Sequence, residues 1–99
     1  MRYNTTTTNG AFDQATLRAV WNKGQVVPGY SPEVIRKDVC GKLMSWADYG
    51  KTSSNLGWEV DHIKPKAKGG GDELSNLQPL HWTNNRSKGD NYPNWSCAA

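Results

Sequence analysis

The stretch GWEVDHIKPKAKGG, residues 57–70, begins with the pattern of a strand and ends with that of a loop. The apolar Trp58 and Val60 alternate with polar residues, which is the two-residue period of a strand with one buried face. An acid and an imidazole, Asp61 and His62, end that strand side by side. Lysines and glycines follow them. This pattern predicts a functional group of side chains at the strand end.

The segments after this stretch predict a second strand and a short helix. Residues 63–75 form a loop whose length, in a compact domain, is typical of functional or disordered segments. LSNLQPL, residues 74–80, predicts a short strand. Its inward-facing residues are expected to be Leu74, Leu77 and Leu80. HWTNNRSK, residues 81–88, favours a helix that ends at Gly89. A turn is the alternative there, because two adjacent asparagines are poor helix formers.

The N-terminal half predicts one further helix. Asp13 is a suitable N-cap for a helix over about residues 14–23, and Gly24 would end it. Residues 33–40 are ambiguous, and a short strand is expected after Gly41. A chain of 99 residues should form one domain. The expected fold is therefore a small α+β domain with two short antiparallel strands, a long loop and a helix, plus an N-terminal helical segment.

Charge and composition narrow the class of partner. The net charge is +3 and the pI is about 9.0, which fits a polyanionic partner without requiring one. No apolar run is long enough to span a membrane, and no signal peptide is evident. Two cysteines make no disulfide framework. We expect a cytoplasmic protein that has no membrane partner.

Residues 61–90, DHIKPKAKGGGDELSNLQPLHWTNNRSKGD, resemble the HNH endonucleases, also called ββα-metal or His-Me finger nucleases. The family pattern is Asp/His-His, a Gly-Gly loop, Asn-Leu-x-x-Leu, and a helix with His or Asn before Lys-Gly-Asp. Asn76 follows His62 by fourteen positions, and Asn85 follows Asn76 by nine, which suits that pattern. The match is specific, because several residue types coincide at fixed offsets.

The resemblance implies a single HNH nuclease domain over residues 1–99 with its ββα-metal core at about 57–90. His62 would be the general base, since imidazole titrates near neutral pH. Asn76 would hold the loop and so aim His62. The implied metal ligands are Asp61 and Asn85. Such oxygen donors favour Mg²⁺ or Mn²⁺, with Zn²⁺ or Ni²⁺ as further options.

The chain departs from the family pattern at two places. Many members carry His where this chain has Asn85. Many also hold a structural zinc with two Cys-x-x-Cys pairs, whereas here the corresponding helix positions are His81 and Asn84, and Cys40 stands alone. We therefore expect no structural zinc, with tryptophans taking over its stabilising role. Cys40 and Cys97 are expected to be unpaired thiols.

For several residues the sequence is compatible with two different roles. The candidate phosphate contacts are Lys64, Lys66, Lys68, Arg86 and Lys88. The three loop lysines could equally be plain solvated residues. Arg86 and Lys88 are the better candidates, because they lie beside the expected metal ligand. His81 is either a packed residue at the helix start or an additional metal or active-site residue.

Three functions are compatible with these patterns. The first is a metal-dependent endonuclease acting on DNA. The second is a nucleic-acid-binding module that keeps the finger and has lost turnover, and the presence of both Asp61 and His62 argues against it. The third is an interaction protein without a nucleic-acid role, which the basic balance disfavours.

Overall fold

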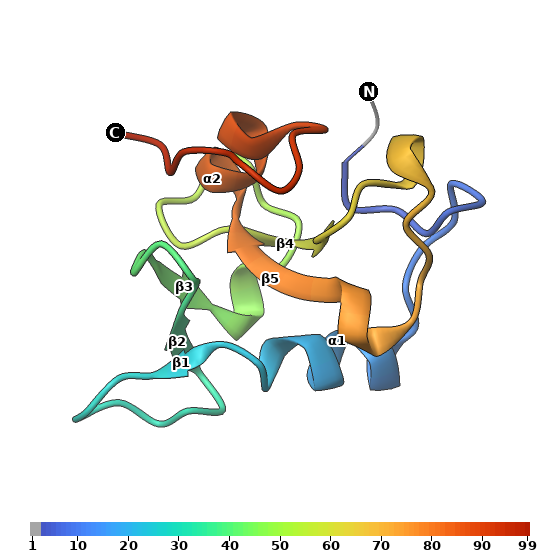
Figure 1. Cartoon of the computed structure of the whole chain (residues 1–99). Helices are drawn as coiled ribbons and strands as arrows, with labels where there is room; N and C mark the ends of the chain where they lie inside the picture. Colours follow the sequence, from blue (N-terminus) through green and yellow to red (C-terminus); the bar gives the residue numbers. More distant parts are fainter. Residues whose placement is uncertain (1–2) are drawn as a thin grey trace.

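A two-stranded antiparallel hairpin, β4 (Trp58–His62) paired with β5 (Leu77–His81), lies at the centre of the fold. The computed structural model describes residues 3–99. Figure 1 shows α2 (Trp82–Lys88) above the hairpin and α1 (Gln14–Trp21) below it. A second antiparallel sheet has the order β1 (Gln25–Val26), β2 (Ile35–Lys37) and β3 (Leu43–Ser45). This is the small α+β fold that the sequence predicts, with the strand at 58–62 and both helices confirmed.

The strand β4 is buried on both faces, although its alternation predicted only one buried face. Trp58 and Val60 enter the hydrophobic core, and Glu59 and Asp61 are buried on the opposite side. The physical reason is that α2 packs against β4 and supplies polar partners for the two carboxylates. The polar face of the strand therefore points into the protein, where it can form a site.

The second strand of the hairpin begins later than predicted. Residues Leu74–Asn76 form a 3-10 turn, and β5 starts at Leu77, which pairs with His62. The prediction that Leu74 points inward is wrong, because that side chain is 46% exposed. Leu77 and Leu80 are fully buried, as predicted. The turn before β5 brings Asn76 next to the beginning of the long loop.

The core is an aromatic cluster between α1 and the hairpin. The rings of Trp21 and Trp58 have centroids 5.1 Å apart, and Trp46 lies 5.8 Å from each of them. Asp13 caps α1 as predicted, accepting a hydrogen bond from the amide of Thr16 at 2.8 Å. Large aromatic rings bury much apolar area, which supports a hairpin of only two strands.

A buried carboxylate joins the start of α2 to the turn between β2 and β3. The oxygen atoms of Asp38 accept hydrogen bonds from the amides of Cys40, Lys42 and His81 and from the side chain of Asn84, at 2.9 to 3.0 Å. From the sequence, His81, Asn84 and Cys40 are aligned with the positions of zinc ligands in related proteins, and all three bond to Asp38 here. The stabilising role expected of the tryptophans stays a prediction.

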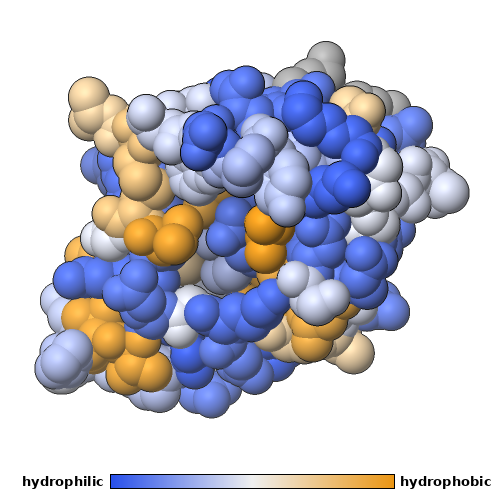
Figure 2. Space-filling view, viewed as in Figure 1, coloured by the Kyte–Doolittle hydropathy of each residue, from blue (hydrophilic) through white to orange (hydrophobic). Residues whose placement is uncertain are grey.

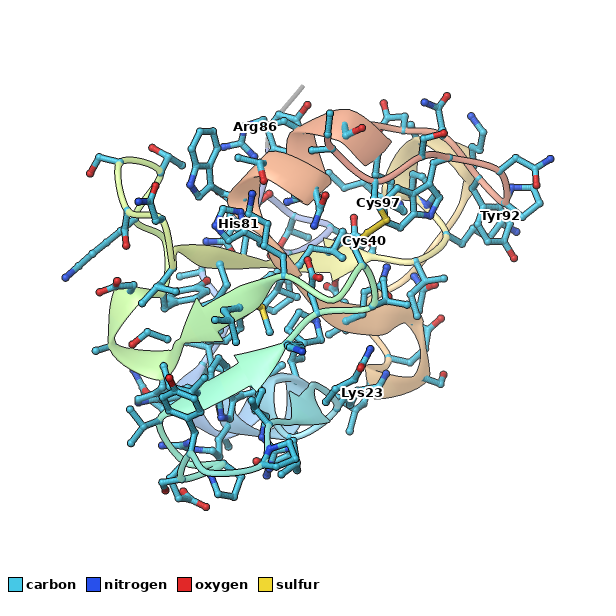
Figure 3. All side chains as sticks on the ribbon, turned by 90° about the vertical axis from the view of Figure 1, so that its left-hand side faces the viewer. Lys23, Cys40, His81, Arg86, Tyr92 and Cys97 are labelled. Atoms are coloured by element: carbon cyan, nitrogen blue, oxygen red, sulfur yellow. A yellow bond between two sulfur atoms is a disulfide. The ribbon has the colours of Figure 1, made fainter. Side chains whose placement is uncertain are left out.

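The two cysteines form a disulfide, so the prediction of unpaired thiols is wrong. Cys40 and Cys97 are 57 residues apart, and the bond fastens the C-terminal tail to the β2–β3 turn (Figure 3). The amide of Ala98 also donates to the Asn84 side chain at 2.8 Å. Disulfides persist mainly in oxidising compartments, and they are rare in the cytoplasm. The expected cytoplasmic localisation stays a prediction.

Among residues 3–99, none of the helices has the length and apolar character that crossing a membrane requires. On the face shown in Figure 2, hydrophobic residues form small separate patches on a mostly hydrophilic surface.

Candidate functional site

A cavity of about 480 Å³ opens where the end of β4, the long loop, α2 and the N-terminal segment meet. Its lining includes Asp61 and His62 from β4 and Asn85 from α2. Residues that are 23 or 24 positions apart in the chain therefore share one cavity, because α2 follows β5 directly and packs back over β4. Asn76 and His81 are not part of this lining.

His62 is held by a carboxylate from the far side of the loop. Its Nε2 lies 2.8 Å from Oδ1 of Asp72, and its side chain is 10% exposed. Burial acts to raise the pKa of Asp72, but hydrogen bonds from His62 and from Thr7 outweigh it and leave that pKa below the ordinary value. An ionised carboxylate only accepts hydrogen bonds, so Nε2 carries the proton. Within residues 3–99, Nδ1 of His62 has no hydrogen-bond partner.

Sequence patterns do not single out Asp72. It lies in a loop, ten residues after His62, among glycines and acids that are common at turns. Only the folded loop brings the two side chains together.

The two ends of the loop are joined by Asn76. Its Oδ1 accepts from the amide of Lys64 at 2.8 Å, and its Nδ2 donates to the carbonyls of Lys64 and Gly71 at 3.1 and 2.9 Å. Only glycine can occupy position 70 in this closed loop, because a Cβ there would lie 1.7 Å from the Lys64 carbonyl oxygen. The loop that carries Asp72 is thereby fixed next to His62.

Asp61 lies in a polar pocket that also contains a buried lysine. Its Oδ2 accepts from Gln78 at 2.9 Å, and its Oδ1 is 3.3 Å from Nζ of Lys88. Burial raises the pKa of Asp61, against the lowering effects of the hydrogen bond from Gln78 and of the Lys88 charge. A nearby cation stabilises the ionised form of such a buried carboxylate.

Lys88 is buried and paired inside the fold, and its role as a phosphate contact stays a prediction. Its side chain is 1% exposed, and Nζ donates to the carbonyl of His62 at 2.9 Å while pairing with Asp61. The physical reason is position on the helix: Lys88 follows Asn85 by three residues and therefore shares its inward face. That spacing could have indicated the burial.

Asn85 is oriented by a neighbouring acid. Its Nδ2 donates to Oε1 of the buried Glu59 at 2.9 Å. The same carboxylate receives both terminal nitrogens of Arg86, at 2.6 and 3.1 Å, and the Arg86 guanidinium lies 3.7 Å from the centre of the Tyr3 ring. Because its nitrogen is engaged, Asn85 offers its amide oxygen as the remaining donor atom. Within residues 3–99 that oxygen receives no hydrogen bond.

His81 is not among the residues that line this cavity, and its role as an additional metal or active-site residue stays a prediction. It is 1% exposed at the start of α2 (Figure 3). Its Nε2 bonds to the carbonyl of Asn55 at 2.7 Å, and its Nδ1 to the hydroxyl of Thr83 at 2.8 Å. Burial lowers the pKa of His81, which therefore favours the neutral ring. The alternative reading of a packed residue at the helix start describes this placement.

The donor set at the cavity fits a hard divalent cation. Asp61 offers a carboxylate oxygen and Asn85 an amide oxygen, both lining the same cavity. The part of the chain that the structure describes contains no group of three or more His, Cys, Asp or Glu side chains arranged to hold a metal. Mg²⁺ is commonly bound by one or two carboxylates together with water and substrate phosphates. The two oxygen donors suit such a site.

Comparison with known proteins places the chain in a family. A family model described as HNH endonuclease matches residues 39–91, which is more than half of the chain and includes the hairpin, the loop and α2. Among curated proteins and among solved structures, none matches. The matched region contains the cavity-lining Asp61, His62 and Asn85. The chain belongs to the HNH endonuclease family.

Proposed function

We propose that this protein is a metal-dependent endonuclease that hydrolyses phosphodiester bonds of DNA at the cavity between β4 and α2. The observation that carries the proposal is that His62, with one ring nitrogen lacking a partner among residues 3–99, lines the same cavity as the oxygen donors Asp61 and Asn85. A base and a pair of hard oxygen ligands side by side suit metal-dependent hydrolysis of a phosphodiester.

In this proposal His62 takes a proton from water through Nδ1. The water oxygen then bonds to phosphorus, the bond between phosphorus and the leaving oxygen breaks, and the leaving oxygen takes a proton from solvent water. His62 afterwards returns its proton to solvent. Asp61 and Asn85 would hold the divalent cation, which would supply stabilisation of the negative charge that develops on the phosphate. Asn76 keeps the loop closed, so that His62 remains oriented while the substrate is bound.

A plasmid-nicking assay with and without divalent metal tests the function. We expect conversion of supercoiled to open-circular DNA in Mg²⁺ or Mn²⁺, and none after chelation by EDTA, because the charge on the phosphate would no longer be stabilised. Binding of DNA without cleavage in either metal would favour the non-catalytic module. Neither binding nor cleavage of DNA would favour the interaction protein. An RNA substrate of equal length establishes the preference between the two nucleic acids.

Contacts to phosphate are proposed for the exposed lysines of the loop, Lys64 and Lys68. Lys66 and Arg86 are already engaged, the first by Asn9 at 2.6 Å and the second by Glu59. We predict that Lys68→Ala weakens binding to all DNA sequences alike and lowers the slope of log K against log salt by about one unit.

Binding isotherms at several salt concentrations measure that slope, with EDTA present to prevent metal-dependent cleavage. Lys51→Ala is the matched control, since Lys51 is exposed but lies outside the loop and pairs with Asp48 at 3.6 Å. An equal change of slope in both variants would show that position in the loop has no role.

A further inference from the structure

The N-terminal segment, residues 3–10, forms one wall of the cavity although it lies outside the region matched by the family model. Tyr3, Asn4, Thr5 and Thr7 are all part of the lining. In Figure 1 this segment runs beside the loop that follows β4. The cavity is thus completed by residues that precede α1 in the chain.

Two side-chain anchors fix this segment in place. Oδ1 of Asn4 accepts from the amide of Val60 at 2.9 Å and from the hydroxyl of Tyr49 at 2.8 Å, which ties the segment to β4. From the loop, Nζ of Lys66 donates to Oδ1 of Asn9 at 2.6 Å and to the carbonyl of Thr6 at 3.2 Å. The segment is therefore held from both sides of the cavity.

Between these anchors, Thr7 binds the carboxylate that holds His62. The Thr7 amide donates to both oxygens of Asp72, at 3.1 and 3.2 Å, and the Thr7 hydroxyl donates to Oδ2 at 2.9 Å. Oδ1 of the same carboxylate is the partner of His62 Nε2 at 2.8 Å. The side chain of Asp72 is 38% exposed. Without Thr7 it would be free to rotate into solvent.

We propose that Asp72 and Thr7 are positioning residues for His62, and that the N-terminal segment is a working part of the active site. Thr7 fixes the Asp72 carboxylate, which accepts a hydrogen bond from the Nε2–H of His62 and so presents Nδ1 as the base. The inference rests on the proposed role of His62. Its consequence is that the imidazole is held in one orientation, with Nδ1 presented to the cavity, before DNA binds.

The test replaces Asp72 by Ala and follows the rate and the tautomer separately. We expect the single-turnover cleavage rate at saturating enzyme to fall about tenfold, which is a fraction of the contribution of a whole general base. The DNA dissociation constant should stay within about twofold, because no phosphate contact is removed. Thr7→Val should cause a smaller loss of rate, and Thr7→Ser, which keeps the hydroxyl, should restore it. Glu73→Ala is the matched control, as it removes the neighbouring exposed charge.

The ¹⁵N NMR shifts of the His62 ring report the tautomer independently of cleavage. At about pH 9, where an ordinary histidine is neutral, the protein should show the Nε2-protonated form, and Asp72→Ala should show a mixture. If the tautomer and the rate are both unchanged in Asp72→Ala, the proposal is overturned. It is also overturned if the rate falls together with DNA affinity while the tautomer stays fixed. If the parent protein never cleaves but the tautomer shifts, the nuclease assignment fails and the positioning of His62 stands.

Discussion

The His62→Ala variant should cleave plasmid DNA about 10²–10⁴-fold more slowly than the parent protein, the range expected when a positioned general base is lost. The imidazole of His62 lines the cavity, and histidine is the side chain that most often acts as a general base. Asp61 and Lys88 cannot take its place, because they are paired with each other at 3.3 Å. The measurement is the single-turnover rate in Mg²⁺ at saturating enzyme.

The fold should survive this change. The hydrogen bond from Lys88 goes to the main-chain oxygen of His62 and is kept in the alanine variant. The thermal midpoint and the affinity for divalent metal should therefore stay close to those of the parent.

His81→Gln is the matched control, because His81 is the only other histidine in the chain. Both of its ring nitrogens bond within the fold, so this variant should affect stability and leave the chemical step intact. Parental cleavage by His62→Ala would remove His62 from the mechanism. If a folded His81→Gln protein no longer cleaved DNA, the assignment of the active site to the cavity around His62 would be refuted.

The parts of the fold that the sequence predicts are those with a local signal. Residues 58–62 alternate with a period of two, and Asp13 and Gly89 mark a helix start and a helix end, so these elements agree with the structure. Leu74 shows the limit of such signals. It continues the apolar spacing of the strand but belongs to a 3-10 turn, where its side chain is exposed.

The contacts that complete the site have no local signal. Thr7 and Asp72 are 65 residues apart, and Cys40 and Cys97 are 57 apart, so nothing in the neighbouring sequence indicates either pair. The burial of Lys88 was not predicted for another reason: a lysine is rarely buried unless it is paired, and its partner Asp61 comes from a different element. Burial of charge depends on tertiary packing, which residue type alone does not reveal.

The second large effect concerns Asn85. We predict that Asn85→Ala lowers the affinity for Mg²⁺ or Mn²⁺ by about 10–100-fold or more. Altering only the residues that surround a metal ligand already costs that much, and this variant removes a ligand itself. The variant removes the amide oxygen that faces the cavity, and the remaining carboxylate of Asp61 is already shared with Lys88 and Gln78. Isothermal calorimetry of metal binding without DNA measures this, and it does not depend on activity.

Two further substitutions test whether the amide oxygen of Asn85 is the metal ligand. Asn85→Asp keeps an oxygen donor at the same position and should retain metal binding. Its cost should fall on stability, because the new carboxylate would lie next to the buried Glu59 that now accepts from the Asn85 amide at 2.9 Å. Asn84→Ala is the matched control: Asn84 is adjacent in α2, but its side chain bonds to Asp38 and to the amide of Ala98. Weaker metal binding in a folded Asn84→Ala protein, with normal binding in Asn85→Ala, would assign the metal ligand to Asn84. That result would refute the assignment of Asn85.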